Sequence, residues 1–287
     1  MKTLRKPIPF GTTLESVEVT LITPQNSPFP YGCYQQNSAT SVTFIVVEKG
    51  SVTLECDFKP HAVEAEYVGF VGPEEVFRLS DPSEDFRGVM MVVPLKFISS
   101  AVKVVFAHHL VDDSPFWLPL ELRATVWQLL GMLEQKTEWL SEPAIHREFV
   151  QHAAMACIKV LTEALVRNIM PFMSSVQRTN LPVIIRLHDL FDEHLKLTRQ
   201  PYYYAELLDV TPSYLNELVK SVVGTSISLY LRMESTRRIC RSLVMTNDSI
   251  HDIAQAWNYD DPAYFTRMFT KITGMTPSKF RANYRRG

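Results

Sequence analysis

One sequence pattern occurs twice in the last third of the chain, fifty residues apart. Residues 211–224 read TPSYLNELVKSVVG, and residues 261–274 read DPAYFTRMFTKITG. Proline, tyrosine, three large apolar residues and glycine occupy the same places in both copies, at 212/262, 214/264, 215/265, 218/268, 219/269 and 224/274. The apolar positions follow the period of a helix, so each copy predicts the same short amphipathic helix.

The beginnings of these helices are marked by residues that favour a helix N-terminus. Thr211, Asp261 and Thr276 each place a side-chain oxygen before a proline, which suits an N-cap followed by the first helical residue. Ser249 and Asp252 have the spacing of a capping box. We expect helices at 182–196, 201–209, 212–223, 226–245, 250–257, 262–273 and 277–284.

Each copy is preceded by a shorter predicted helix, 201–209 or 250–257, with a small residue, Ala205 or Ala254, where the two helices would cross. A helix, a turn of a few residues and a second helix make a helix-turn-helix motif. The helix between the two motifs has about 20 residues and would be about 30 Å long. This is close to one turn of B-DNA, so both second helices could enter successive major grooves of double-stranded DNA.

The charge distribution agrees with a polyanionic partner. Residues 220–287 hold 11 basic and 5 acidic residues, whereas residues 1–180 hold 15 basic and 20 acidic residues. A basic end on an acidic body favours binding of nucleic acid, although a solvated basic surface gives the same composition.

Residues 182–287 resemble the DNA-binding domain of the AraC/XylS family of bacterial transcription regulators. The residues that carry the resemblance are Ala205, Tyr214-Leu215, Gly224, Tyr230, Thr246, Ser249-Ile250, Ile253-Ala254, Asp261, Tyr264-Phe265, Arg267, Phe269, Gly274, Thr276-Pro277 and Phe280-Arg281. The sequence departs from the family at Ser235 and Ile239, where Arg and Ala are usual, at Asn258, where Gly is usual, and at Thr270, where Lys is usual. The resemblance implies a sequence-specific regulator, an activator that contacts RNA polymerase and responds to a small-molecule effector.

The outward faces of the two repeated helices supply the candidate DNA contacts. For bases these are Ser213, Asn216, Glu217, Ala263, Tyr264 and Arg267, and for phosphates Thr211, Lys220, Asp261, Lys271 and Arg281. Arg267 suits the O6 and N7 atoms of guanine, and the alternative is a phosphate contact. Tyr264 could instead pack in the core, and Ser213 and Asn216 could simply be solvated.

The first two-thirds of the chain has a different pattern. Short alternating segments up to about residue 97 predict strands of a small antiparallel sandwich or barrel. The same region resembles the cupin-like barrel common in this family. Helical periodicity follows at 118–170, and residues 173–181 have the composition of a linker. We therefore expect an α+β protein of two domains, with a sensor or dimerisation domain at 1–172 and a DNA-binding domain at 182–287.

Two questions about the N-terminal domain stay open. The stripe formed by Leu122, Val126, Leu129 and Leu133 is either a cover packed on the barrel or the seam of a homodimer. The barrel either binds an effector or serves only association with itself or another protein. A partly polar interior would favour an effector, and an interior filled with apolar side chains would favour association.

Several classes of protein are disfavoured. The histidines form neither an HxH nor an HExxH pattern, and GxSxG, P-loop and GxGxxG motifs are absent, so we expect no enzyme, metal or cofactor. Four widely spaced cysteines favour free thiols in the cytoplasm. The apolar runs are too short to span a membrane.

Overall fold

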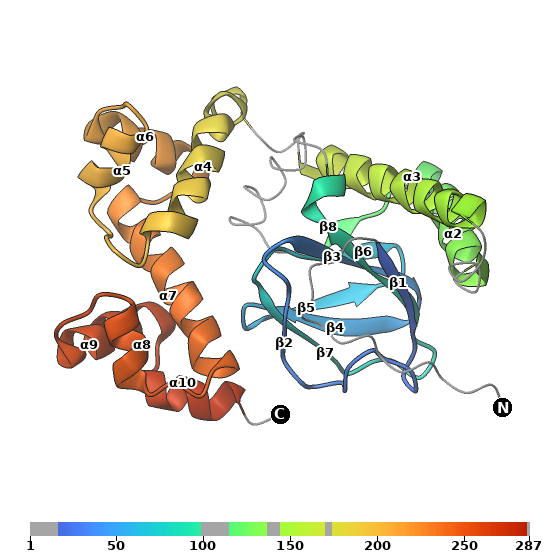
Figure 1. Ribbon diagram of the computed structural model, residues 1–287, viewed down its shortest axis with the longest axis horizontal. Helices are drawn as coiled ribbons and strands as arrows, with labels where there is room; N and C mark the ends of the chain where they lie inside the picture. Colours follow the sequence, from blue (N-terminus) through green and yellow to red (C-terminus); the bar gives the residue numbers. More distant parts are fainter. Residues whose placement is uncertain (1–16, 99–114, 137–143, 170–173, 286–287) are drawn as a thin grey trace. The chain divides into compact units, whose positions relative to one another are not determined.

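The computed structural model describes residues 17–98, 115–136, 144–169 and 174–285. It divides into two compact units, Met1–Pro171 and Phe172–Gly287 (Figure 1). The first unit holds all the described strands, and the second is all-helical. The predicted α+β class with two domains is therefore confirmed.

The N-terminal unit contains two antiparallel sheets. The first has the order β1 (Glu18–Ile22), β8 (Arg87–Pro94), β3 (Ser41–Lys49), β6 (Tyr67–Val71) and β9 (Phe116–Trp117). The second has the order β2 (Gln35–Gln36), β7 (Val76–Ser80), β4 (Ser51–Cys56) and β5 (Lys59–Glu64). A short 3₁₀ helix, η1 (Leu95–Phe97), follows β8. The strand ladders among the described residues form two separate sheets, so the expected cupin-like barrel is only approximate.

Apolar side chains from both sheets meet in one core. Ile45 and Val92 come from the first sheet, and Leu54, Val63 and Phe77 come from the second. All are buried. The strands β3 and β8 are buried along almost their whole length, whereas β4 and β7 include partly exposed positions. The core between the sheets is thus mainly apolar, and the buried polar residues Asn37, Ser41 and Thr43 bond one another beside it.

Gly50 connects β3 to β4 in a turn that another residue could not make. Its φ is +70°, in the left-handed region, and an added Cβ would lie 2.9 Å from the Cα of Phe86.

Two helices, α2 (Leu120–Lys136) and α3 (Ala144–Ile169), pack against each other in the same unit (Figure 1). On α2, Val126 and Leu130 are buried, whereas Leu122 and Leu129 are only partly buried. The side chain of Leu133 lies outside the described residues. Val126 is fully buried within its own unit, as expected if this part of the stripe packs as a cover. A dimer seam formed by the other residues of the stripe stays a prediction.

The C-terminal unit consists of seven helices within the described range. They are α4 (Ser175–His194), α5 (Pro201–Leu207), α6 (Pro212–Val223), α7 (Ile227–Met245), α8 (Ile250–Ala256), α9 (Pro262–Thr273) and α10 (Pro277–Tyr284). Six of them match the predicted helices to within two residues. None of the helices in the described ranges is long and apolar enough to cross a membrane.

Helix α4 begins earlier than expected, so residues 175–181 are helical rather than part of a linker. Pro182 lies inside this helix, although proline normally breaks one. Leu181, Ile184 and Leu187 are buried on one face that continues past the proline. We attribute the longer helix to this tertiary packing, which outweighs the local cost of the proline.

Candidate nucleic-acid interface

The two helix-turn-helix motifs have the same internal construction. Ala205 in α5 and Ala254 in α8 are each 1% exposed, which lets the paired helices approach closely. The N–H of Val210 donates to the carbonyl of Ala205, and the N–H of Tyr259 donates to the carbonyl of Ala254, both at 3.0 Å. The repeat recognised in the sequence is therefore a repeat of structure.

The turn between the helices requires a left-handed residue in both copies. Asp209 and Asn258 each have a φ of +56°, which Asp and Asn tolerate better than most residues. The second turn is longer by one residue. The two motifs are consequently related by 49 positions before the turn and by 50 positions after it.

Helices α6 and α9 carry the predicted caps. The Thr211 hydroxyl accepts from the N–H of Tyr214 at 3.2 Å, and the Asp261 carboxylate accepts from the N–H of Ala263 at 2.8 Å. Both helices end at a glycine with a φ of +78°, Gly224 or Gly274. The cap side chains are thus engaged within their own helices, and contact with phosphate would come from the helix N-terminus.

The outward face of α9 is open to solvent. Ala263, Tyr264, Arg267 and Lys271 are exposed, with Tyr264 at 50%, while the opposite face of the helix is buried. The guanidinium of Arg267 makes one loose ion pair, 3.7 Å from the Asp261 carboxylate. The structure therefore brings the sequence-predicted residues of α9 together on one accessible surface.

The outward face of α6 has the same layout. Ser213, Glu217 and Lys220 are exposed, and the Lys220 ammonium lies 3.0 Å from the Glu217 carboxylate. Tyr214 is 52% exposed, at the position equivalent to Tyr264. Tyr214 is not among the contacts predicted from the sequence, although its repeat partner Tyr264 is, and the repeat itself is the signal that identifies it.

Asn216 differs from the expectation of a base contact. It is partly buried, and its Oδ1 accepts from the N–H of Ile227, the first residue of α7, at 3.3 Å. Its Nδ2 donates to the Glu217 carboxylate at 3.2 Å. The amide thus holds the start of α7 against α6, because an unpaired N–H at a helix start needs an acceptor.

Arg281 also differs from the expectation of a phosphate contact. Its Nε donates to the carbonyl of Leu243 at 3.0 Å, and its Nη2 donates to the carbonyl of Asp248 at 2.7 Å. Burial lowers the pKa of the guanidinium. These bonds hold α10 against the end of α7, so Arg281 has a structural role in this unit.

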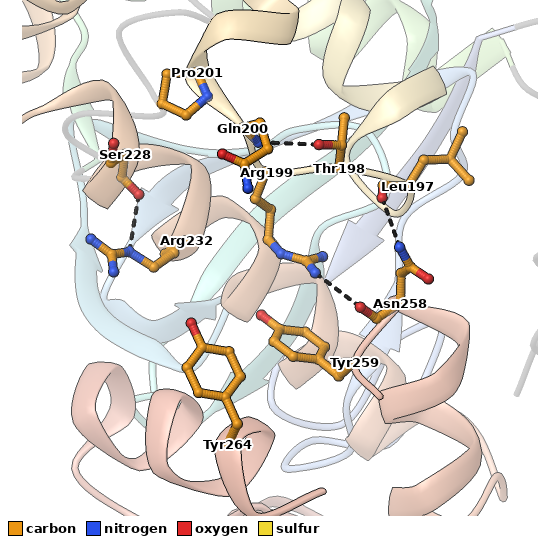
Figure 2. A pocket seen from close by; sticks show the side chains of 10 residues that line it. All are labelled: Leu197, Thr198, Arg199, Gln200, Pro201, Ser228, Arg232, Asn258, Tyr259 and Tyr264. Atoms are coloured by element: carbon orange, nitrogen blue, oxygen red, sulfur yellow. Dashed lines mark hydrogen bonds between the residues drawn. The ribbon is translucent and has the colours of Figure 1, made fainter. Parts of the chain in front are cut away.

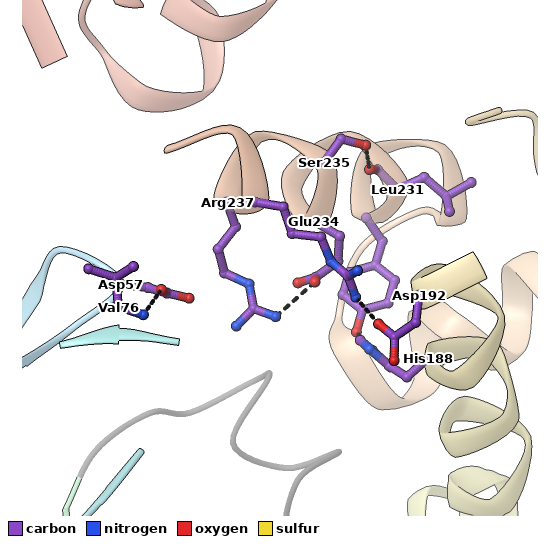
Figure 3. Close-up of polar contacts among 10 residues, drawn as sticks. Asp57, Val76, His188, Asp192, Leu231, Glu234, Ser235 and Arg237 are labelled. Atoms are coloured by element: carbon purple, nitrogen blue, oxygen red, sulfur yellow. Dashed lines mark hydrogen bonds and ion pairs between the residues drawn. The ribbon is translucent and has the colours of Figure 1, made fainter. Parts of the chain in front are cut away.

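Helix α7 joins the two motifs and carries a buried polar cluster (Figure 3). The Arg237 guanidinium donates to the Glu234 carboxylate at 2.8 Å, and the imidazole of His188 on α4 is hydrogen-bonded to the hydroxyl of Tyr230. Burial lowers the pKa of His188 to about 4. Although burial alone would raise the pKa of Glu234, the neighbouring Arg237 holds it below its usual value. At neutral pH His188 is therefore neutral and Glu234 is charged.

The positions where α7 departs from the family are both buried. Ser235 and Ile239 are fully inaccessible, and the Ser235 hydroxyl donates to the carbonyl of Leu231 at 2.6 Å. A small hydroxyl that bonds its own helix needs no partner from another element. The helix can pack without the usual Arg and Ala.

A cleft of about 540 Å³ lies between the two motifs (Figure 2). It is lined by Leu197, Thr198, Arg199, Gln200, Pro201, Ser228, Arg232, Asn258, Tyr259 and Tyr264. This lining contains two arginines and no carboxylate, and it reaches Tyr264 at the start of α9. The guanidinium of Arg199 turns toward the second motif, where it stacks on Tyr259.

The described residues contain no group of three or more His, Cys, Asp or Glu side chains placed to hold a metal ion. The surface gathered on α6 and α9 is instead built from hydroxyl, aromatic and basic groups, together with the carboxylate of Glu217. These are the groups with which proteins bind base edges and phosphates.

Known proteins match this chain most specifically in the C-terminal unit. Residues 204–283 match a family model described as a helix-turn-helix domain. The MmsAB operon regulatory protein of Pseudomonas aeruginosa is 27% identical over 194 residues, which is 64% of this chain and 60% of that protein. The transcriptional activator RhaR of Yersinia pseudotuberculosis is 36% identical over 73 residues, 24% of each chain.

Solved structures with a similar arrangement include a protein of unknown function from Listeria innocua and ToxT from Vibrio cholerae. The first is 27% identical, covers 36% of this chain and 97% of its own, and has a TM-score of 0.33. The second is 11% identical, covers 95% of this chain and 100% of its own, and has a TM-score of 0.46.

The chain spans 60% of the length of the Pseudomonas relative and a quarter of that of RhaR. The family model spans both helix-turn-helix motifs of this chain. The chain therefore carries a helix-turn-helix domain of the AraC type at residues 204–283.

Proposed function

We propose that the protein is a transcription regulator that binds double-stranded DNA at specific sites through both helix-turn-helix motifs. The observation that carries the proposal is the matching exposure of α6 and α9, each with a tyrosine and a basic residue on its open face. Helix α7 has 19 residues and is about 28 Å long, which suits two contacts on one face of B-DNA. Such a protein would act in the cytoplasm, where promoter DNA and RNA polymerase are found.

The proposed base contacts are Ser213, Tyr214 and Glu217 on α6, and Ala263, Tyr264 and Arg267 on α9. Lys220 and Lys271 lie further along the same faces and suit phosphates. Glu217 can accept from the amino group of cytosine, and Arg267 can donate to guanine.

The N-terminal unit has two proposed roles. The apolar filling between its sheets, with Leu54 and Phe77 from one and Ile45 from the other, supports a role in association. The second role, the sensing of a small-molecule effector, rests on the family. It would need a site outside this packed core or a rearrangement of it.

Selection of bound sequences from a random duplex library with the full chain tests DNA recognition. Enrichment of one motif with two parts about one helical turn apart is expected. The measured affinity should fall steeply with salt, because each phosphate contact releases counterions. Lys271→Gln should reduce the salt slope by about one, whereas Lys279→Gln, an exposed lysine on α10, serves as the control. Failure to enrich any motif would refute the proposal.

A thermal-shift screen of small metabolites, followed by DNA-binding assays with any hit, separates the two roles of the N-terminal unit. A compound that raises the unfolding temperature and changes DNA affinity supports sensing. Sedimentation over a concentration series tests association, and a monomer at all concentrations with no hit in the screen would count against both roles.

A further inference from the structure

The loop between α4 and α5 reaches across the C-terminal unit and bonds the turn of the second helix-turn-helix motif (Figure 2). Nη1 of Arg199 donates to the carbonyl of Trp257 at 2.8 Å, and Nη2 donates to the carbonyl of Asn258 at 3.3 Å. In return, Nδ2 of Asn258 donates to the carbonyl of Leu197 at 3.0 Å. The bonded residues are about sixty positions apart in the chain.

Stacking strengthens this bridge. The guanidinium carbon of Arg199 lies 4.3 Å from the centre of the Tyr259 ring, a cation–π distance. Tyr259 is 6% exposed and packs edge-on against Phe265 of α9, with ring centres 5.2 Å apart. The bridge therefore ends on the second reading helix itself.

The other end of the bridge is fixed to the first motif. The hydroxyl of Tyr204 in α5 donates to the carbonyl of Thr198 at 2.8 Å, within the loop that carries Arg199. Tyr204 is fully buried and packs against Phe191 of α4. The loop that carries Arg199 is thus attached to the core of the first motif.

Without this bridge, α7 would be the main element joining the two motifs. A single helix can bend gently along its length, and a small bend changes the distance between elements at its two ends. A second link away from the helix axis opposes such a bend. Asn258 makes the link from a position where the family usually has glycine, which could not supply the amide.

We propose that Arg199 and Asn258 are positioning residues that brace the two reading helices and so determine which spacing of DNA half-sites the protein accepts. The proposal rests on the DNA-binding function proposed above. Neither residue needs to touch a base for this role. The brace acts by preventing the two motifs from adapting to half-sites set too close or too far apart.

The decisive variant is Asn258→Gly. Glycine adopts the φ of +56° at this position without strain, so the turn is kept while the bond to Leu197 is lost. Asp209→Gly is the matched control, because Asp209 is an exposed residue with the same φ in the first turn. Arg199→Ala removes the bonds from Arg199 to the carbonyls of Trp257 and Asn258. Arg199→Lys keeps the positive charge but cannot donate in the same bidentate manner.

Affinity is measured for duplexes whose two half-sites are at the selected spacing or are moved by one base pair either way. The wild type should bind the selected spacing best by a wide margin. Asn258→Gly and Arg199→Ala should lose about three- to tenfold at that spacing and less at the others, which flattens the profile. Asp209→Gly should keep the wild-type profile. Equal losses at all spacings would show a merely structural role and overturn the proposal.

A measurement without DNA separates this proposal from the DNA-binding function. Spin labels at Ser213→Cys and Ala263→Cys, in a Cys33→Ser background, report the distance between the two exposed helix starts; the other three cysteines are buried. The distribution should be narrow in the parent and broader with Asn258→Gly or Arg199→Ala. An unchanged distribution in both variants would show that α7 alone holds the motifs, and the brace would be refuted even if DNA binds.

Discussion

The guanidinium of Arg267 lies 3.7 Å from the carboxylate of Asp261, the N-cap of its own helix. Both side chains are largely exposed, at 70% and 58%. An exposed ion pair at this distance contributes little to stability, so Arg267 can leave Asp261 at small cost when a stronger partner is present.

For this reason Arg267→Ala should leave folding unchanged and weaken binding to the selected DNA site. We expect a loss of about 1–3 kcal/mol at that site and a relaxed preference at one base pair. Binding to duplexes with each base pair exchanged in turn provides the measurement. An equal loss on selected and random DNA would assign Arg267 to a phosphate instead.

Asn216→Ala should act on stability rather than on sequence preference. The substitution leaves the N–H of Ile227 without its acceptor, which should lower the free energy of unfolding by about 0.5–1.5 kcal/mol. Chemical denaturation measures this change, with Ser213→Ala, on the exposed face of the same helix, as the control. A shifted base preference with unchanged stability would restore Asn216 as a reading residue.

His188 should make the protein less stable in mild acid. Its pKa is about 4 in the folded chain, against about 6.5 in an unfolded one, so the unfolded state binds more protons between these values. The stabilisation is complete above about pH 6.5 and is lost as the pH falls toward 4. Because the residue keeps some access to solvent, we expect a loss of about 1–3 kcal/mol.

Denaturant unfolding of the wild type and of His188→Gln from pH 7.5 to 4 tests this prediction. The difference between the two proteins should change across the window, since glutamine does not titrate. Glu234 reinforces the loss only at lower pH, because its pKa is already below the usual value of a carboxyl. A constant difference between the two proteins would contradict a neutral His188 in the folded state.

Helix α2 offers a test of the dimer seam. Leu129→Arg, at a partly buried position, should give a folded chain with weaker self-association if this face is the seam. Val126→Arg should instead destabilise folding, because Val126 is fully buried in its own unit. Gln128→Arg is an exposed control with the same added charge. If Leu129→Arg associates like the wild type, the seam does not include this face of α2.

Local signals in the sequence were sufficient to predict most of the helices in the C-terminal unit. Thr211, Asp261 and Thr276 each cap the helix predicted to follow them, because a cap and the proline after it act within one turn of the chain. The repeat also identified the two motifs, since its period reflects the burial of the same apolar face twice. The exposed face of α9, with Arg267, followed from that period.

The tertiary structure decided what depends on distant partners. Residues 175–181 look like a linker locally, yet they form the start of α4, where Leu181 is buried and Asn180 bonds Ser221 of α6. Asn216 looks like a reading residue, and the N–H of Ile227 occupies its amide oxygen. No local pattern could reveal that Arg199 bonds Trp257, because the two residues lie 58 positions apart and meet only when both motifs are folded. Caps and periodicity depend on a few neighbouring residues, whereas a brace between motifs depends on the whole unit.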